Sequence, residues 1–329
     1  MTQTQSTRRS VRILRRIVAS EYLVLFLCLA WFAVLAPVAP GFATPRNLTN
    51  ILAALLPLLV VATGQTMVLI TGGIDLSVTS IIALASVAGS ALVTGAGGLL
   101  DASPLAVPAG ILTMLAVGAG VGLLNGTCVA ILRMPPFMVT LATMMFFSGL
   151  AIWSTQSRSI HDLPPGLLLA GGNVWISAAV ALTVALAAHL VLRRTLLGRW
   201  IHAAGQNPKA ALVSGVPLQR TLILSYLICG LAAGVAALLI TGRLETGSPV
   251  HGRSQLLDII GAVVIGGTSL YGGRGAVAWT AGGVLFLTLI DNSLNLLSLS
   301  HFAIMMVKGA VILFAAFLDT LRSRLTTGT

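Results

Sequence analysis

The chain has 329 residues, of which 57% are hydrophobic and only 8% are charged, far below the roughly 25% charged residues of an average soluble domain. Such a chain cannot cover itself with polar surface, which excludes a soluble globular protein, and its length fits about ten membrane spans of ~20 residues with short loops. The formal net charge of +11 does not indicate nucleic acid as a partner, because the basic residues lie beside apolar segments without interleaved aromatic residues for base stacking.

The N-terminal stretch is rich in arginine and precedes a long apolar run. Five arginines lie between Arg8 and Arg16, and the apolar run extends from Tyr22 to Pro37. No small-residue cleavage site stands out in this run. We therefore expect a first span that is anchored by cytoplasmic arginines, rather than a cleaved signal peptide.

Apolar stretches separated by short polar segments predict an all-α polytopic membrane protein with about ten transmembrane helices. The expected domain order is a basic segment at 1–20, one membrane domain at 21–320 and a tail at 321–329. We expect spans at about 22–39, 48–70, 76–95, 104–132, 137–155, 173–192, 221–241, 257–271, 275–298 and 301–319.

With the N-terminus inside, most lysines and arginines fall in inner segments. Only four arginines fall outside, at Arg46, Arg158, Arg243 and Arg253. This asymmetry is the one that the positive-inside rule describes. Both termini are therefore expected in the cytoplasm.

Thr71-Gly-Gly-Ile-Asp-Leu-Ser77 interrupts an apolar stretch with two glycines and an acid. Irregular backbone at membrane depth is tolerated only where protein or a water-filled cavity surrounds it, so this segment predicts a broken helix. The Asp75 carboxylate could cap the helix that follows, as Asp before Ser commonly does, or it could line a translocation path together with Ser77.

A second interruption lies between Asn125 and the Pro135-Pro136 pair, and the next span carries Thr140 and Thr143 on one helix face. Hydroxyl groups that face a bundle interior would suit a neutral polyhydroxylated solute. Threonine in a span more often bonds to its own helix backbone. Asn125 and the two threonines are nevertheless candidates for the solute path.

The ninth predicted span carries Asp291, Asn292 and Asn295, which we interpret as a polar stripe because positions 291 and 295 are one helical turn apart. An acid and two amides at this depth must pair or face water. Lys308 in the last span lies too deep for easy snorkelling, so we expect an Asp291–Lys308 pair.

The longest polar segment, Arg193 to Arg220, lies on the inner side. It predicts one short helix at Pro208–Val213, with Asn207 as the N-cap and Gly215 as the terminator. Such a helix on the cytoplasmic face could be a docking element for a partner protein or part of an ordinary connection. Both interpretations stay open on these residues alone.

Glycine and cysteine have packing roles in this interpretation. Gly118, Gly122 and the Gly230-x-x-x-Gly234 spacing fall inside spans, where they let helix backbones approach closely. Cys28, Cys128 and Cys229 are isolated in apolar runs, which is typical of core residues. A short internal repeat relates Val68–Leu76 to Val263–Leu270.

Motifs for catalysis, metal binding or nucleotide binding are absent from the sequence: it has no Walker A, HExxH or GxSxG pattern and no acidic pair at metal-ligand spacing. We therefore expect no enzyme, no metal and no cofactor. Energy from ATP would have to come from another polypeptide.

The string Gly72-Gly-Ile-Asp-Leu-Ser77 resembles the GGIDLSVGS pattern of the ribose/xylose/autoinducer-2 branch of ABC importer permeases. Thr79 replaces the expected glycine, and Asp291 replaces an expected amide. Further ordered matches run through most of the chain, at Leu124-Asn-Gly126, Pro136-Phe137, Thr140–Thr143, Gly198-Arg199, Gly205, Asn207, Ser214-Gly215, Asp258, Gly266–Leu270 and Gly272–Gly275.

The resemblance implies a ten-helix fold similar to the vitamin B12 importer permease in a bacterial inner membrane. It also implies a second permease, identical or homologous, two cytoplasmic ABC ATPases, and a periplasmic solute-binding protein. The loop at 193–220 would be the element that couples to the ATPase. The candidate coupling residues in this loop are Gly198, Arg199, Gly205, Asn207, Pro208, Ala210, Ala211, Ser214 and Gly215.

The function that follows is alternating-access import of a sugar or sugar-like solute, with few charges along the candidate path favouring a neutral polar solute. A branched-chain amino acid type ABC permease is one alternative. An ion-coupled secondary transporter is another, which would use Asp75, Asp291 and Lys308 at an ion site.

Overall fold

The computed structural model describes residues 23–101 and 103–327, with side chains up to residue 317. The predicted segment 1–20 and the last two residues of the predicted tail lie outside these ranges. Within them the chain forms thirteen α-helices, and the only β-type pairing is an isolated bridge between Ile160 and Gly247. The helices are α2 (Leu23–Leu35), α3 (Pro45–Ile70), α4 (Val78–Val93), α5 (Ala106–Ala130), α6 (Pro136–Thr155), α7 (Pro165–Gly172), α8 (Val174–Arg194), α9 (Leu196–Gln206), α10 (Pro208–Val213), α11 (Leu218–Leu244), α12 (Leu256–Ile265), α13 (Val277–Leu296) and α14 (His301–Thr327).

The prediction of an all-helical polytopic membrane protein is confirmed. A helix occupies each of the ten predicted span positions, and six of them are long and apolar enough to cross a membrane: α3, α5, α6, α8, α11 and α13. The helices α2, α4, α12 and α14 contribute shorter apolar segments. The predicted span 257–271 is wrong in extent, because α12 ends at Ile265 and would cover only roughly 15 Å along its axis.

The predicted loop at 193–220 is more helical than expected, since it holds α9 as well as α10. Two glycines in α9 weaken its intrinsic helix propensity. The helix forms because the Thr195 hydroxyl caps it, by accepting the Gly198 amide, and because Ile201 and Ala204 are buried. α7 was not predicted either.

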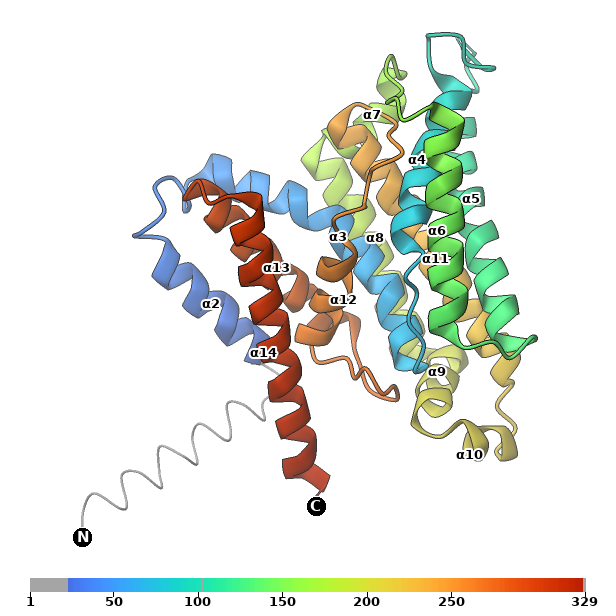
Figure 1. Cartoon of the computed structure of the whole chain (residues 1–329), viewed down its shortest axis with the longest axis vertical. Coiled ribbons are helices and arrows are strands. Elements are labelled where there is room, and N and C mark those ends of the chain that lie inside the picture. The colour runs from blue at the N-terminus through green and yellow to red at the C-terminus, as the bar shows by residue number, and fades with distance from the viewer. Residues whose placement is uncertain (1–22, 102, 328–329) are drawn as a thin grey trace.

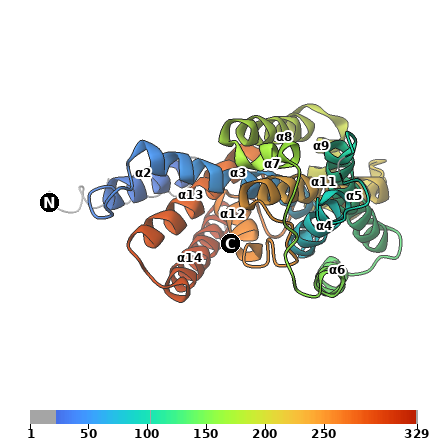
Figure 2. The ribbon, with the colours of Figure 1, turned by 90° about the horizontal axis from the view of Figure 1, so that it is seen from above.

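α11 is the central helix of the larger group, and it packs against α3, α4, α5 and α7 (Figures 1 and 2). The predicted close approach of glycines is confirmed between α5 and α11: a Cβ atom on Gly118 would lie 2.2 Å from the carbonyl oxygen of Gly230. Cys28 and Cys229 are buried free thiols. α2, α13 and α14 form a second group on the other side of α3 and α12 (Figure 1).

Candidate functional site

The end of α3 and the end of α12 have the same turn, which confirms the predicted internal repeat at this point. In both turns a glycine adopts the left-handed conformation, Gly72 at φ +83° and Gly267 at φ +87°. Its amide and that of the next residue bond back to the last helical turn, as in a Schellman motif. The bonds are Gly72 N to Leu69 O (2.9 Å) and Gly73 N to Val68 O (3.2 Å) after α3, and Gly267 N to Val264 O (2.8 Å) and Thr268 N to Val263 O (3.1 Å) after α12.

Asp75, in the turn after α3, is fully buried and belongs to a chain of hydrogen bonds. Its Oδ1 accepts from the Ser77 amide at 2.9 Å and from the Ser77 hydroxyl at 2.6 Å, and the Ser77 Oγ accepts from Asn125 Nδ2 at 2.8 Å. The N-cap residue of α4 is Ser77. Asp75 therefore satisfies a free amide ahead of the helix, but that amide belongs to the N-cap residue and not to the first turn.

Gln65 of α3 holds the backbone of Asp75 from the other side. With its amide group oriented to satisfy both atoms, it donates to the Asp75 carbonyl and accepts from the Asp75 amide, each at 3.2 Å. Sequence reasoning missed Gln65 because a single glutamine in an apolar helix has no motif around it. The turn is thus fixed by side chains of α3 and α5.

Thr140 joins α6 to the same turn, because its hydroxyl donates to the carbonyl of Ile74 at 3.0 Å as well as to Pro136 O in its own helix. Thr143 bonds only within α6, to Val139 and Thr140. The structure thus brings together four predicted residues, Asp75, Ser77, Asn125 and Thr140, all of them fully buried.

The polar stripe on α13 differs from its prediction in one residue. The Asn295 amide donates to the Asp291 carboxylate at 3.2 Å, as the one-turn spacing implies. Asn292 instead faces α3, where it exchanges two hydrogen bonds with Asn47, of 2.8 and 3.0 Å. Adjacent helical positions point about 100° apart, which separates Asn292 from the stripe.

The predicted Asp291–Lys308 pair is confirmed, at 2.9 Å. Lys308 Nζ also lies 2.9 Å from the carboxylate of Asp258 in α12. The sequence pattern did not reveal Asp258 as a partner, because it stands 50 residues away in a short helix. This ion cluster joins α12, α13 and α14.

α10 has the predicted bounds and the predicted cap, since Asn207 Oδ1 accepts the Ala210 amide at 3.0 Å. The predicted terminator Gly215 has φ +82°. Ala211 is buried within the subunit, whereas Leu212 and Val213 are 62% and 90% exposed. The exposed side chains of α10 therefore include two large apolar residues that were not predicted, although two such residues in a short polar segment were a signal.

Of the other predicted loop residues, some pack against their own subunit and the rest are exposed. Gly198 and Gly205 face their own subunit: an added Cβ atom would lie 2.2 Å from Leu192 O at Gly198 and 1.8 Å from Ile70 O at Gly205. Exposed residues in the same loop are Arg199, Asn207, Pro208, Ala210, Ser214 and Gly215.

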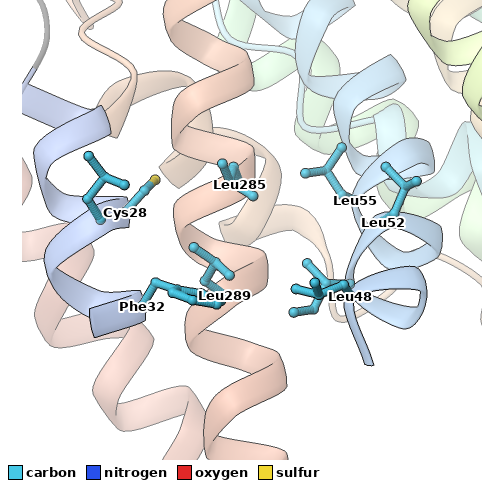
Figure 3. A pocket seen from close by; sticks show the side chains of 9 residues that line it. Cys28, Phe32, Leu48, Leu52, Leu55, Leu285 and Leu289 are labelled. Carbon is cyan, nitrogen blue, oxygen red and sulfur yellow. The ribbon is translucent and has the colours of Figure 1, made fainter. Parts of the chain in front are cut away.

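An apolar cavity of about 340 Å³ lies between α2, α3 and α13 (Figure 3). Cys28 and Phe32 come from α2, and Leu285 and Leu289 from α13. All the lining side chains are apolar, so the cavity has no groups to bond a hydroxylated solute. Its chemistry matches lipid chains better.

All the known proteins that this chain matches in the comparisons below are transport permeases. The family model described as "Branched-chain amino acid transport system / permease component" matches residues 47–316. The "Ribose import permease protein RbsC" of Bacillus subtilis (strain 168) is 38% identical over 296 residues, which cover 86% of this chain and 88% of that protein. RbsC of Escherichia coli (strain K12) is 35% identical over 97% of this chain and 98% of its own.

A third relative has a different name, the "L-arabinose transport system permease protein AraH" of Escherichia coli (strain K12). It is 32% identical over 92% of this chain and 89% of its own. No solved structure matches.

Proposed function

This chain belongs to the branched-chain amino acid transport system / permease component family, and we propose that it is the membrane-spanning subunit of an ABC importer for a sugar or sugar-like solute. The observation that carries the proposal is full-length similarity to permeases named for ribose and for arabinose. These relatives favour a sugar over an amino acid. The family is one of transport permeases and not of enzymes.

Alternating access by this subunit requires a separate source of energy, and a cytoplasmic ABC ATPase docked on α10 is the partner that we propose. Val213 is 90% exposed and Leu212 62%, and exposed apolar side chains on a polar face mark a protein contact. Arg199 and Lys209 are exposed nearby in the sequence. The apolar pair would supply the buried centre of the contact, and the basic residues its rim.

The proposed orientation places α9 and α10 in the cytoplasm. In Figure 1 these helices, the α5–α6 loop, the turn after α12 and the end of α14 lie at one end of the molecule. Arg133, Arg274 and the basic residues of 193–220 belong to that end, as the positive-inside rule requires. We propose ten crossings in the bacterial inner membrane, a fold like the vitamin B12 importer permease, and both termini in the cytoplasm.

The remaining partners follow from the same proposal: a second permease, identical or homologous, and a periplasmic solute-binding protein at the opposite end. The path between two permeases would be lined in part by the predicted polar residues of α13, of which Asp291 and Asn295 are accessible. The buried residues Asp75, Ser77, Asn125 and Thr140 would not line the path themselves but would position the helices that do. The solute itself would be neutral and polar.

The test is co-purification from the native host in mild detergent. Val213→Asp would place a charge in the proposed contact, which costs several kcal/mol when it is left unpaired, so ATPase recovery should fall at least about tenfold. Val213→Ile, which keeps an apolar β-branched side chain, is the matched control and should retain the ATPase. Absence of a Walker A protein from the wild-type preparation would refute the proposal.

Uptake of labelled ribose and L-arabinose by intact cells separates the energy sources. An ATP-driven importer should lose uptake when ATP is depleted and keep it when ionophores collapse the ion gradients. The opposite result would favour an ion-coupled transporter, and substitutions at Asp75 and Asp291 would then become the first experiments.

A further inference from the structure

Three short segments meet where α9 ends. The Gly273 amide, in the connection after α12, donates to the carbonyl of Ile70, the last residue of α3, at 2.7 Å. Gly205 of α9 lies against both of these groups: an added Cβ atom would be 1.8 Å from Ile70 O and 2.5 Å from Gly273 N. Since atoms cannot approach so closely, only glycine fits at position 205.

At this contact the backbones of α9, of the turn after α3 and of the connection after α12 approach one another closely. A Cβ atom on Gly272 would lie 2.9 Å from Gly72 N and 3.1 Å from Gly205 O. Gln206 Nε2 donates to Gly273 O at 3.4 Å. Backbone contacts of this kind leave little compressible side-chain volume, so a displacement of one segment must displace the others.

Both segments that meet Gly205 lead to helices of the membrane domain. The turn after α3 continues into Asp75 and Ser77, which hold α5 through Asn125, and its Ile74 carbonyl holds α6 through Thr140. The connection after α12 leads directly into α13, which is tied to α14 by Lys308. The end of α9 thus touches the starting points of two separate routes into the helix bundle.

We propose that Gly205 is a positioning residue that transmits movement of α9 and α10 at once to the end of α3 and to the connection after α12. The inference rests on the proposed function, because α10 must be the helix that an ATPase moves. Gly205 does not contact the ATPase in this arrangement; it connects the docking helix to the bundle.

The experiment uses the complete complex in lipid vesicles with a spin label at Tyr271→Cys. Tyr271 is 87% exposed and lies in the connection after α12, so a label there reports movement of that connection without knowledge of the solute. Cys128, the partly exposed native thiol, is replaced by alanine. ATP should change the mobility of the label in the otherwise unmodified complex.

In Gly205→Ala the added methyl group should separate α9 from Ile70 and from Gly273. We expect the ATPase to remain bound and to hydrolyse ATP, while the ATP-dependent change in label mobility falls about tenfold. Gly120→Ala is the matched control, because nothing lies within 4 Å of a Cβ atom there. An undiminished label response in an assembled Gly205→Ala complex would overturn the inference and leave the proposed function intact.

Loss of the ATPase from the unmodified complex would instead overturn the proposed function, and this inference with it. A second variant, Gln206→Ala, removes only the side-chain bond to Gly273. It should lower the label response about twofold without disturbing assembly. If Gly205→Ala does not assemble, Gln206→Ala decides: an unchanged response refutes the transmission role of this contact.

Discussion

Lys308 Nζ lies 2.9 Å from a carboxylate oxygen of Asp258 and 2.9 Å from one of Asp291. One cation therefore pairs with two acids from different helices. Asp258 and Lys308 are 18% and 14% exposed, whereas Asp291 is 48% exposed. The part-buried Asp258–Lys308 pair depends more on its partner than Asp291 does, because Asp291 is more exposed to water.

Lys308→Met should destabilise the subunit by about 2 kcal/mol, because it leaves the part-buried Asp258 without a counter-charge. Lys308→Arg keeps the charge and is the control. Thermal unfolding in detergent measures both. Adding Asp258→Asn to Lys308→Met should recover part of the loss, and a double variant no more stable than Lys308→Met would show that the charge is not the cause.

Ser77→Ala should remove the hydroxyl that links Asp75 to Asn125. We expect a cost of about 1–3 kcal/mol, because Asp75 Oδ1 loses one donor and Asn125 Nδ2 loses its acceptor in a buried setting. Thr143→Val is the control, since that hydroxyl bonds only to carbonyls of its own helix. Equal unfolding temperatures for the two variants would contradict the importance of the chain around Asp75.

Gly118→Ala should push α5 away from α11. The added carbon would lie 2.2 Å from Gly230 O, and overpacking of this kind typically costs about 1–3 kcal/mol. Gly120→Ala, two residues along the same helix, meets nothing within 4 Å and should be neutral. The comparison of urea or heat unfolding curves tests helix packing without any assumption on function.

The burial of His251 predicts that the stability of the fold depends on pH. It lies in the loop between α11 and α12, where burial lowers its pKa to about 4, and its Nδ1 is 3.1 Å from Ser86 Oγ. The unfolded chain takes up a proton near pH 6.5 and the folded chain only near pH 4. Stability should thus be full above pH 6.5 and fall between the two values by about 3 kcal/mol.

His251→Gln should flatten this pH profile, because it removes the group that titrates differently in the two states. Unfolding temperatures measured from pH 7.5 to 4.5 give the comparison. A profile of the same slope in wild type and His251→Gln would assign the pH dependence to other groups.

The features that depend on neighbouring residues or on position within a span follow from the sequence alone. The apolar stretches located ten helices, because the cost of unpaired backbone in lipid leaves a helix as the available structure. The bounds of α10 followed from Asn207, Pro208 and Gly215, which act within a few residues of themselves. The Asp291–Lys308 pair followed from the depth of two charges, since each must find a partner in an apolar span.

Only the tertiary structure decided which side chains meet across distant helices. Asn292 pairs with Asn47, and Asp258 with Lys308, because helix packing brings those faces together. The role of Gly205 is of the same kind: its need for glycine comes from the Ile70 carbonyl and the Gly273 amide, which converge on it from other parts of the chain. Such contacts depend on the relative placement of whole helices, and no local pattern encodes that placement.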